Sequence, residues 1–249
     1  CMSLIILRIG EQISILEVHF NSVTSTNEIC LERLEEKKHS SVLISSNSQT
    51  NGRGRNQNKW HSKEGNIYFS FGFIKDNLSE KIPLQTAVVV SDAIKDFFGI
   101  DIQLKWPNDL FVEGKKIGGI LCETKIENSK IKTMVIGVGV NVNESIAEHD
   151  KSIQKNLTTM LEVSKHPHQR ELIVAEFINS FELWLNTLSV EPNQIIEAWL
   201  EKCMHLNERI LFLQNEKILE GVFCGLDDNG FAKIKIDNQV KYFNSIDLV

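Results

Sequence analysis

The chain has 249 residues, of which 42% are hydrophobic and 24% are charged, and its net charge is −6. It is long enough to bury a full core, as one large domain or as one large domain plus a small one. The net negative charge excludes a general affinity for nucleic-acid backbones, so any anion site must be a local basic pocket.

The first hundred residues alternate between strand and helix patterns. They predict strands at 14–20, 41–46 and 66–73, and helices at about 25–38 and 84–98. Ser25, Thr26 and Asn27 are N-cap candidates for the first helix, and Gly99 is placed as a C-cap for the second. The strand at 66–73 alternates apolar and polar side chains, which is typical of a half-buried strand.

The rest of the chain has patterns of further strands and helices, and near its end the pattern changes to short strands only. We predict strands at 103–105, 116–125, 132–143, 209–213, 218–224 and 231–236, turns at 127–130 and 227–230, and helices near 157–161, at 173–188 and from Pro192 to about 202. Antiparallel strands with helices set to one side indicate an α+β fold with a mixed or antiparallel sheet. We place the domain boundary so that residues 1–205 precede a β-barrel-like module at 206–249.

Five cysteines are scattered along the chain without the two-residue spacing of a zinc or redox motif: Cys1, Cys30, Cys122, Cys203 and Cys224. We therefore expect reduced thiols and a cytoplasmic protein. No apolar run reaches the roughly 20 residues of a membrane span, and residues 4–9 are too few for a signal peptide. Met2 is expected to be the natural first residue, with Cys1 an addition.

Residues 49–60 form a loop suited to holding anions. Gly52, Arg53, Gly54 and Arg55 alternate there, and Trp60 closes the segment. Glycines let backbone N–H groups approach a ligand, and arginines offer a planar fork of donors to carboxylate or phosphate. The alternative reading of Gly-Arg-Gly-Arg alone is a solvated basic turn.

Three further motifs follow in order. Residues 105–110 read Lys-Trp-Pro-Asn-Asp-Leu, which places a cation, an indole, an amide and a carboxylate at the end of a strand. Residues 115–121 read Lys-Lys-Ile-Gly-Gly-Ile-Leu, and residues 137–143 read Gly-Val-Gly-Val-Asn-Val-Asn. Taken alone, the second could be a β-bulge and the third a strand under a tightly packed helix.

Together with the upstream Ser-Thr-Asn, this ordered set closely resembles the biotin protein ligases, from about residue 14 to the end of the chain. The resemblance implies a mixed sheet flanked by helices, related to class II aminoacyl-tRNA synthetases and lipoate ligases, followed by a small SH3-like barrel. It also implies that biotin and ATP, with Mg²⁺, give biotinyl-5′-AMP, which acylates one lysine of a biotin carboxyl carrier protein.

The resemblance also suggests roles for individual residues. Arg55, Lys116 and Lys105 are the expected catalytic cations, with Arg55 bridging carboxylate and α-phosphate. The residues expected at biotin are Ser25, Thr26, Asn27, Gln49, Gly52, Arg53, Gly54, Arg55, Lys116, Gly118 and Gly119. Those expected on the nucleotide side are Arg53, Arg55, Trp60, Lys105, Trp106, Asn108 and Asn141, and Asp109 is the candidate partner of Mg²⁺.

The chain departs from the family pattern in three places. Asn56, Gln57 and Asn58 stand where further glycine or basic residues are common, so we expect weaker triphosphate contacts or a more mobile loop. After Asn143 no aromatic residue is evident that could cover the adenine. Only about twenty residues precede the Ser-Thr-Asn motif, too few for a helix-turn-helix domain, so we expect a ligase that does not bind DNA.

Other polar and aromatic residues are expected to be structural. We predict surface positions for six of the seven histidines, at 39, 61, 149, 166, 168 and 205, core positions for Trp184 and Trp199, and an inert buried thiol at Cys122. Arg209 is a candidate for reaching phosphates across the domain interface.

Two other functions stay open from the sequence. A lipoate or octanoate ligase would use the same fold, and a non-catalytic biotin sensor would need no cations aimed at a phosphate. A free sheet edge could pair two protomers as a homodimer, or receive the carrier domain as an added strand.

Overall fold

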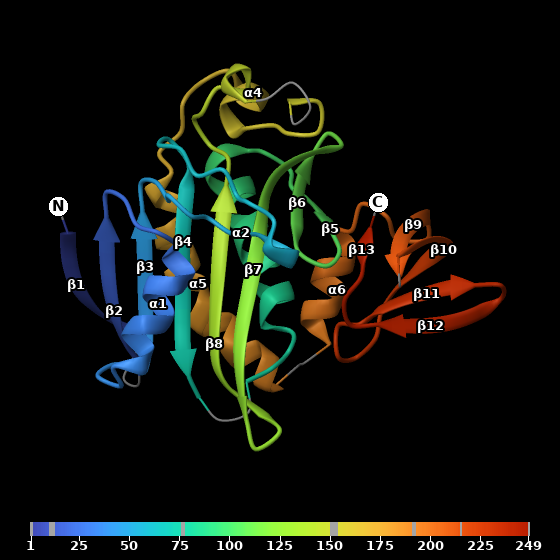
Figure 1. Ribbon diagram of the computed structural model, residues 1–249, viewed down its shortest axis with the longest axis horizontal. Helices are drawn as coiled ribbons and strands as arrows, with labels where there is room; N and C mark the ends of the chain where they lie inside the picture. The colour runs from blue at the N-terminus through green and yellow to red at the C-terminus, as the bar shows by residue number, and fades with distance from the viewer. Residues whose placement is uncertain are drawn as a thin grey trace.

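Two β-sheets organise the protein, whose computed structural model describes residues 2–9, 13–75, 78–149, 154–190, 193–214 and 216–248. The larger sheet has eight strands in the order β1-β2-β3-β4-β8-β7-β6-β5, and the smaller has five in the order β12-β11-β10-β9-β13. They lie side by side, with β1 at the far end of the larger sheet (Figure 1). The α+β prediction is confirmed.

The larger sheet is mixed, because β2 and β3 are parallel whereas its other neighbouring strands are antiparallel. Its strands are β1 (Met2–Ile9), β2 (Ile13–Phe20), β3 (Ser41–Ser46), β4 (Ile67–Ile74), β5 (Gln103–Lys105), β6 (Asp109–Val112), β7 (Lys115–Glu127) and β8 (Lys130–Val140). The predicted turn between β7 and β8 is present, with positive φ at Asn128 and Ser129. Strand β6 was not predicted, since its four residues directly follow the Pro-Asn pair.

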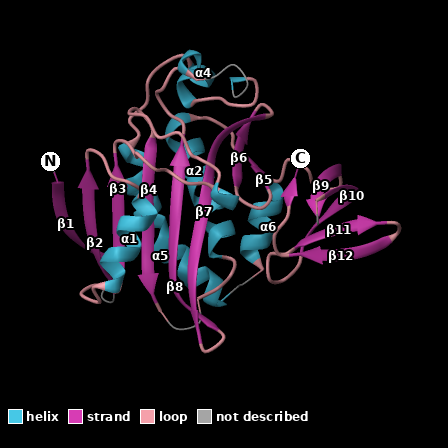
Figure 2. Cartoon of the chain, in the orientation of Figure 1, coloured by secondary structure: helices cyan, strands magenta, loops and turns pink. Residues whose placement is uncertain are grey.

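Helices cover both faces of this sheet. Helix α1 (Thr26–Glu35) crosses one face over β3 and β4, and α2 (Ile82–Phe98), α5 (Glu171–Val190) and α6 (Gln194–Glu201) lie on the other (Figure 2). Gly99 ends α2 with a φ of 68°, as predicted. The short α4 (Met160–Ser164) begins later than predicted, because Thr159 caps it by accepting a hydrogen bond from the Glu162 N–H. Pro192, the predicted start of α6, lies outside the described residues.

The prediction of a half-buried strand at 66–73 is wrong. Every residue from Ile67 to Phe73 is buried, because α1 packs on the face that was expected to meet solvent. Gly72 allows this close approach: a Cβ there would lie 2.6 Å from the Cys30 sulfur. On the opposite face Phe69 stacks against Phe177 of α5, with ring centroids 5.0 Å apart.

The smaller sheet consists of β9 (Arg209–Gln214), β10 (Lys217–Leu226), β11 (Ala232–Ile236), β12 (Gln239–Phe243) and β13 (Asp247–Leu248). Phe212 and Phe223 are fully buried in its core. The turn at 227–230 is confirmed, with Gly230 at a φ of 86°. The antiparallel β module predicted for this part of the chain is present, and within the described residues it does not close, because β12 and β13 are not paired. The boundary at 205 stays a prediction.

Polar contacts join the two sheets. The Trp106 indole N–H donates to the Gly230 carbonyl at 3.3 Å, and the Lys105 ammonium donates to the Leu248 carbonyl at 3.4 Å. Leu84 of α2 packs closely on Gly230: a Cβ at position 230 would lie 2.8 Å from a methyl group of Leu84. The small sheet is therefore fixed against the loops that follow β5.

The prediction that all six histidines lie at the surface is wrong for three of them. His168 and His205 are buried, and the side chain of His149 is only 5% exposed beside Glu144. His168 is held by Ser164, whose Oγ lies 2.7 Å from its Nε2. The core prediction for Trp199 is confirmed, whereas the side chain of Trp184 lies outside the described ones.

His205 gives the protein an expected loss of stability in acid. Its ring packs 4.3 Å from that of Phe223, and burial lowers the pKa of His205 to about 4. Between pH 6.5 and 4 the unfolded chain therefore binds the extra proton, so the free energy of unfolding should fall by about 2 kcal/mol from pH 7 to pH 5. His205→Leu should remove that loss in denaturant titrations, and His166→Ala, at an exposed histidine, should not. Equal slopes in wild type and His205→Leu would contradict a neutral buried imidazole.

Candidate active site

The Gly-Arg-Gly-Arg loop is closed on itself by backbone hydrogen bonds. The Gly54 N–H donates to the Asn58 carbonyl at 2.7 Å, and the Asn58 N–H donates to the Arg55 carbonyl at 3.0 Å. Asn56 stands at the turn with a φ of 54°, a left-handed conformation that asparagine tolerates well. Asn56 and Asn58 stand where the family pattern has glycine or basic residues, and both shape the turn.

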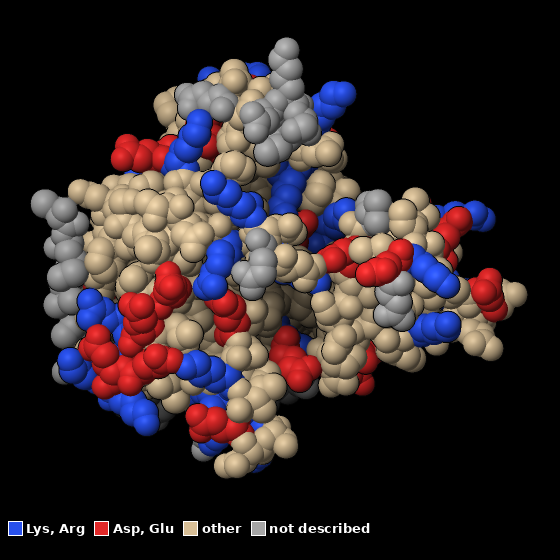
Figure 3. Space-filling view, viewed as in Figure 1, with Lys and Arg blue, Asp and Glu red and all other residues tan. Residues whose placement is uncertain are grey.

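Beneath this loop lies a cavity of about 290 Å³ on the face of the larger sheet that carries α1. Figure 3 shows Lys and Arg side chains gathered around the middle of this face. Twelve residues predicted from the sequence line the cavity: Ser25, Thr26, Asn27, Gln49, Arg53, Gly54, Arg55, Trp60, Asn108, Asp109, Lys116 and Gly119. Segments far apart in the chain therefore meet at one site.

One end of the cavity is a neutral hydrogen-bond network. The Gln49 side-chain oxygen accepts from the Thr26 backbone N–H at 2.8 Å and lies 3.1 Å from the Thr26 hydroxyl. The Gln49 amide nitrogen donates to Ser62 at 2.9 Å. Ser25 occupies the N-cap position of α1, yet its hydroxyl makes no capping hydrogen bond, which leaves it for the cavity. The amide of Gln49 is thus fixed in one orientation.

The network continues below Thr26. Ser70 of β4 is fully buried, and its hydroxyl lies 2.7 Å from the Thr26 hydroxyl and 2.6 Å from the Asn27 side-chain oxygen. The Asn27 amide nitrogen donates to the Glu123 carboxylate at 2.7 Å. Ser70 and Glu123 were not predicted, because neither belongs to a motif and both reach the site only through strand register.

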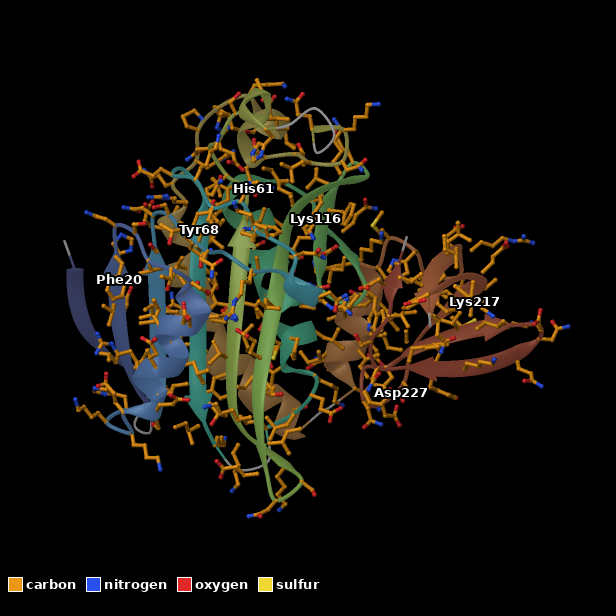
Figure 4. All side chains as sticks on the ribbon, in the orientation of Figure 1. Phe20, His61, Tyr68, Lys116, Lys217 and Asp227 are labelled. Atoms are coloured by element: carbon orange, nitrogen blue, oxygen red, sulfur yellow. The ribbon has the colours of Figure 1, made fainter. Side chains whose placement is uncertain are left out.

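The other end is cationic. Lys116 is the second residue of β7 and lies below the overlying loops (Figure 4), and its Nζ lies 2.7 Å from an oxygen of Asp109. The same ammonium sits 5.3 Å from the ring centroid of Trp60. The indole lies flat on the backbone of Gly139, where a Cβ would come within 2.8 Å of its nitrogen. The Trp60 N–H is buried without a hydrogen-bond partner.

Arg55 is held by the smaller sheet. Its guanidinium donates to the Ser245 hydroxyl at 2.7 Å and to the Ile246 carbonyl at 3.4 Å, and lies 3.6 Å from the Asp247 carboxylate. The other oxygen of Asp247 accepts from the Asn56 amide at 2.7 Å. Asp247 also lines the cavity, so the small sheet contributes a wall of the site. This contribution gave no signal in the sequence.

Five predicted residues do not line the cavity: Gly52, Lys105, Trp106, Gly118 and Asn141. Gly52 packs against Ser62 inside the loop, and Gly118 faces the Gly139 carbonyl across the sheet. Trp106 is 2% exposed and, like Lys105, bonds to the small sheet. The Asn141 amide donates to the Thr158 carbonyl at 3.2 Å and so holds the segment before α4.

Three of the remaining predictions meet different outcomes. Arg209 points outward, 82% exposed and paired with Glu220, so it does not reach the cavity. Burial raises the pKa of the Cys122 thiol to about 12, in agreement with an inert group. Asp109 is paired with Lys116, and the described residues hold no cluster of three or more His, Cys, Asp or Glu suited to a metal ion.

No helix in the described part is long and apolar enough to cross a membrane.

Known proteins share both the sequence and the fold. Residues 19–141 match the biotin/lipoate A/B protein ligase family, and residues 205–246 match the biotin protein ligase C-terminal domain. The bifunctional ligase/repressor BirA of Bacillus subtilis is 26% identical over 93% of this chain and 73% of its own length. A biotin–[acetyl-CoA-carboxylase] ligase of Paracoccus denitrificans is 26% identical over 83% of this chain and 88% of its own.

A solved structure agrees with these matches. The biotin protein ligase from Aquifex aeolicus, in complex with biotin and ATP, superposes with a TM-score of 0.79 and 28% identity over 94% of this chain and 98% of that one. The two matched segments include β3 to β8 of the larger sheet, β9 to β12 of the smaller sheet, and every residue that lines the cavity except Asp247. The chain therefore belongs to the biotin protein ligase family.

Proposed function

We propose that this protein is an ATP-dependent biotin protein ligase. It forms biotinyl-5′-AMP and pyrophosphate from biotin and ATP, and then transfers biotin to one lysine of a biotin carboxyl carrier protein. The observation that carries the proposal is the division of one cavity into a neutral hydrogen-bonding end around Gln49 and a cationic end around Lys116. Biotin has the same division, with an uncharged ureido ring at one end and a carboxylate at the other.

The neutral end suits the ureido ring, which presents one carbonyl acceptor and two N–H donors. Gln49 uses one amide hydrogen on Ser62 and keeps the other for a ligand. The Ser25 hydroxyl, buried and free of a capping bond, is a further partner. A site that hydrogen-bonds a neutral polar group in this way rejects ligands that lack the group, since its own polar atoms would be left unpaired.

The cationic end suits two anions that must be brought together. The carboxylate of biotin has to attack the α-phosphorus of ATP, and fixed cations offset the repulsion between them. Lys116 is our choice for the carboxylate and for the charge that develops at phosphorus, with Arg53 and Arg55 beside it. Lys116 pairs with Asp109, and Arg55 pairs with Asp247. Asp109 is the residue of this chain that would partner Mg²⁺, which would offset part of the charge of the triphosphate.

In the second step the amine of the carrier lysine attacks the carbonyl carbon of the adenylate, and AMP leaves. The carrier must therefore reach the rim of the cavity. Beyond Ile120, strand β7 pairs only with β8 among the described residues, so its edge over residues 121–127 is open beside the cavity. We propose that the carrier docks along this edge as an added strand.

We also propose that the protein works in the cytoplasm, where its four described cysteines stay reduced.

The test is to incubate the protein with ATP, Mg²⁺ and one of biotin, lipoate or octanoate, and to measure acyl-adenylate and pyrophosphate by mass spectrometry. Adenylate with biotin alone supports the proposal. Product with lipoate or octanoate instead would move the protein to the neighbouring ligases, and no product with any acid would contradict a ligase function.

Gly137 on the cavity floor gives a sharper prediction about biotin. A Cβ at this position would lie 2.2 Å from the side-chain oxygen of Asn27, so alanine must push the amide out of place. Gly137→Ala is expected to weaken biotin binding about tenfold or more in isothermal titration calorimetry, with circular dichroism unchanged. Wild-type affinity would mean that Asn27 does not contribute to the site.

A further inference from the structure

Glu123 links two parts of the cavity that the motifs describe separately. It lies on β7 opposite Val135 of β8, and its side chain is 40% exposed. One carboxylate oxygen accepts a hydrogen bond from the Asn27 amide nitrogen at 2.7 Å. The other lies 3.5 Å from the Arg53 guanidinium. Asn27 itself is only 4% exposed, so its partners are set by the fold.

The contacts of Asn27 fix which way its amide faces. The amide nitrogen has two hydrogens, and its two partners are Glu123 and the Leu121 carbonyl at 3.4 Å. An ionised carboxylate and a carbonyl can only accept, so they must face the NH₂ group. The amide oxygen accepts from Ser70 at 2.6 Å and keeps one lone pair. The Asn27 amide therefore offers a ligand an acceptor.

Glu123 is the group that fixes this orientation of the Asn27 amide. The Ser70 hydroxyl can donate or accept, and it would fit either orientation of the Asn27 amide. The Leu121 carbonyl is a long contact by comparison with the 2.7 Å bond to Glu123, which is charge-assisted. Without the carboxylate the amide is free to reverse and to present its NH₂ group to the ligand.

We propose that Glu123 is a positioning residue that sets the ligand specificity of the cavity: it orients Asn27 to accept a hydrogen bond from a ring N–H of the ureido group. The inference rests on the proposed function and deepens it. Through its second oxygen Glu123 also holds Arg53, so the orientation of the ureido-binding amide is tied to the position of the arginine loop.

The test uses two cyclic carbamate analogues of biotin, each with one ring N–H replaced by oxygen. In wild type, the Asn27 oxygen would face a ring oxygen in one of them, so that analogue should bind about tenfold or more weakly than biotin in calorimetry. In Glu123→Ala the amide can reverse and donate to the ring oxygen. The ratio of the two dissociation constants should then fall by about tenfold.

Two variants keep the result interpretable. Glu123→Gln retains an oxygen that can accept from Asn27, so it should restore the wild-type ratio to within about threefold. Glu32→Ala, at an exposed position on α1, should leave the ratio unchanged. A ratio in Glu123→Ala equal to that of wild type, or no discrimination in wild type, would overturn the proposal. Failure of wild type to bind biotin at all would instead overturn the proposed function.

Discussion

Alanine in place of Lys116 is expected to lower the rate of biotinyl-5′-AMP formation by about a hundredfold or more, the loss typical of one preorganised donor at a developing charge. Lys116 is positioned for this role by its neighbours, because Asp109 holds the ammonium at 2.7 Å and Trp60 covers it. In the variant the Asp109 carboxylate would face the anions without its counter-charge, which adds repulsion to the lost attraction.

Single-turnover formation of the adenylate, followed by rapid quench and mass spectrometry, measures this effect directly. Lys115 provides the matched control, since it is the preceding residue, carries the same charge and is exposed. Lys115→Ala should react at the wild-type rate. A Lys116→Ala variant as fast as Lys115→Ala would remove Lys116 from the proposed mechanism.

Replacing Arg55 by alanine is expected to have a comparable effect, about a hundredfold or more on adenylate formation. Arg55 has a second function in the fold, because its guanidinium binds Ser245 and Ile246, which directly precede β13, and Asp247 within it. The variant should therefore also loosen the loop, so the KM values for biotin and ATP should rise as well as kcat fall.

Two further variants separate these contributions. Ser245→Ala removes the 2.7 Å hydrogen bond to Arg55 and leaves the guanidinium available to the ligand, so its rate should fall only a few-fold. Arg209→Ala removes an exposed cation of the same sheet and should have no effect. If Ser245→Ala were as slow as Arg55→Ala, the arginine would act through the loop and not on the substrate.

Local pattern was enough to predict most of the fold. Helix α2 follows from apolar spacing and Gly99, and β7 and β8 follow from two long strand patterns joined by a polar turn. The burial of β4 on both faces could not be predicted, because the alternation within one strand says nothing about α1, the helix that packs over it. Strand β12 was missed because its apolar residues Val240 and Tyr242 alternate on the exposed face, and only Phe243 at its end is buried.

The functional site was also predictable only in part from the sequence. Motif residues such as Gln49, Asn108 and Lys116 do meet in one cavity, as their resemblance to a family implied. Lys105 and Trp106 belong to an equally distinctive motif, yet both bond to the C-terminal module, because β5 ends at Lys105 and the chain turns at Trp106. Asp247 is distant in the chain and enters the site only because two sheets pack together.

The attachment of the arginine loop to residues 245–247 changes how variants of this protein should be interpreted. The backbone that presents these acceptors is held in place by β9, whose core side chain Phe212 lies in the small sheet and outside the cavity. A substitution that loosens that core would misplace Arg55 without altering any group that meets substrate. In a genetic screen such a lesion would be scored as a catalytic defect, although its origin is in the folding of a separate sheet.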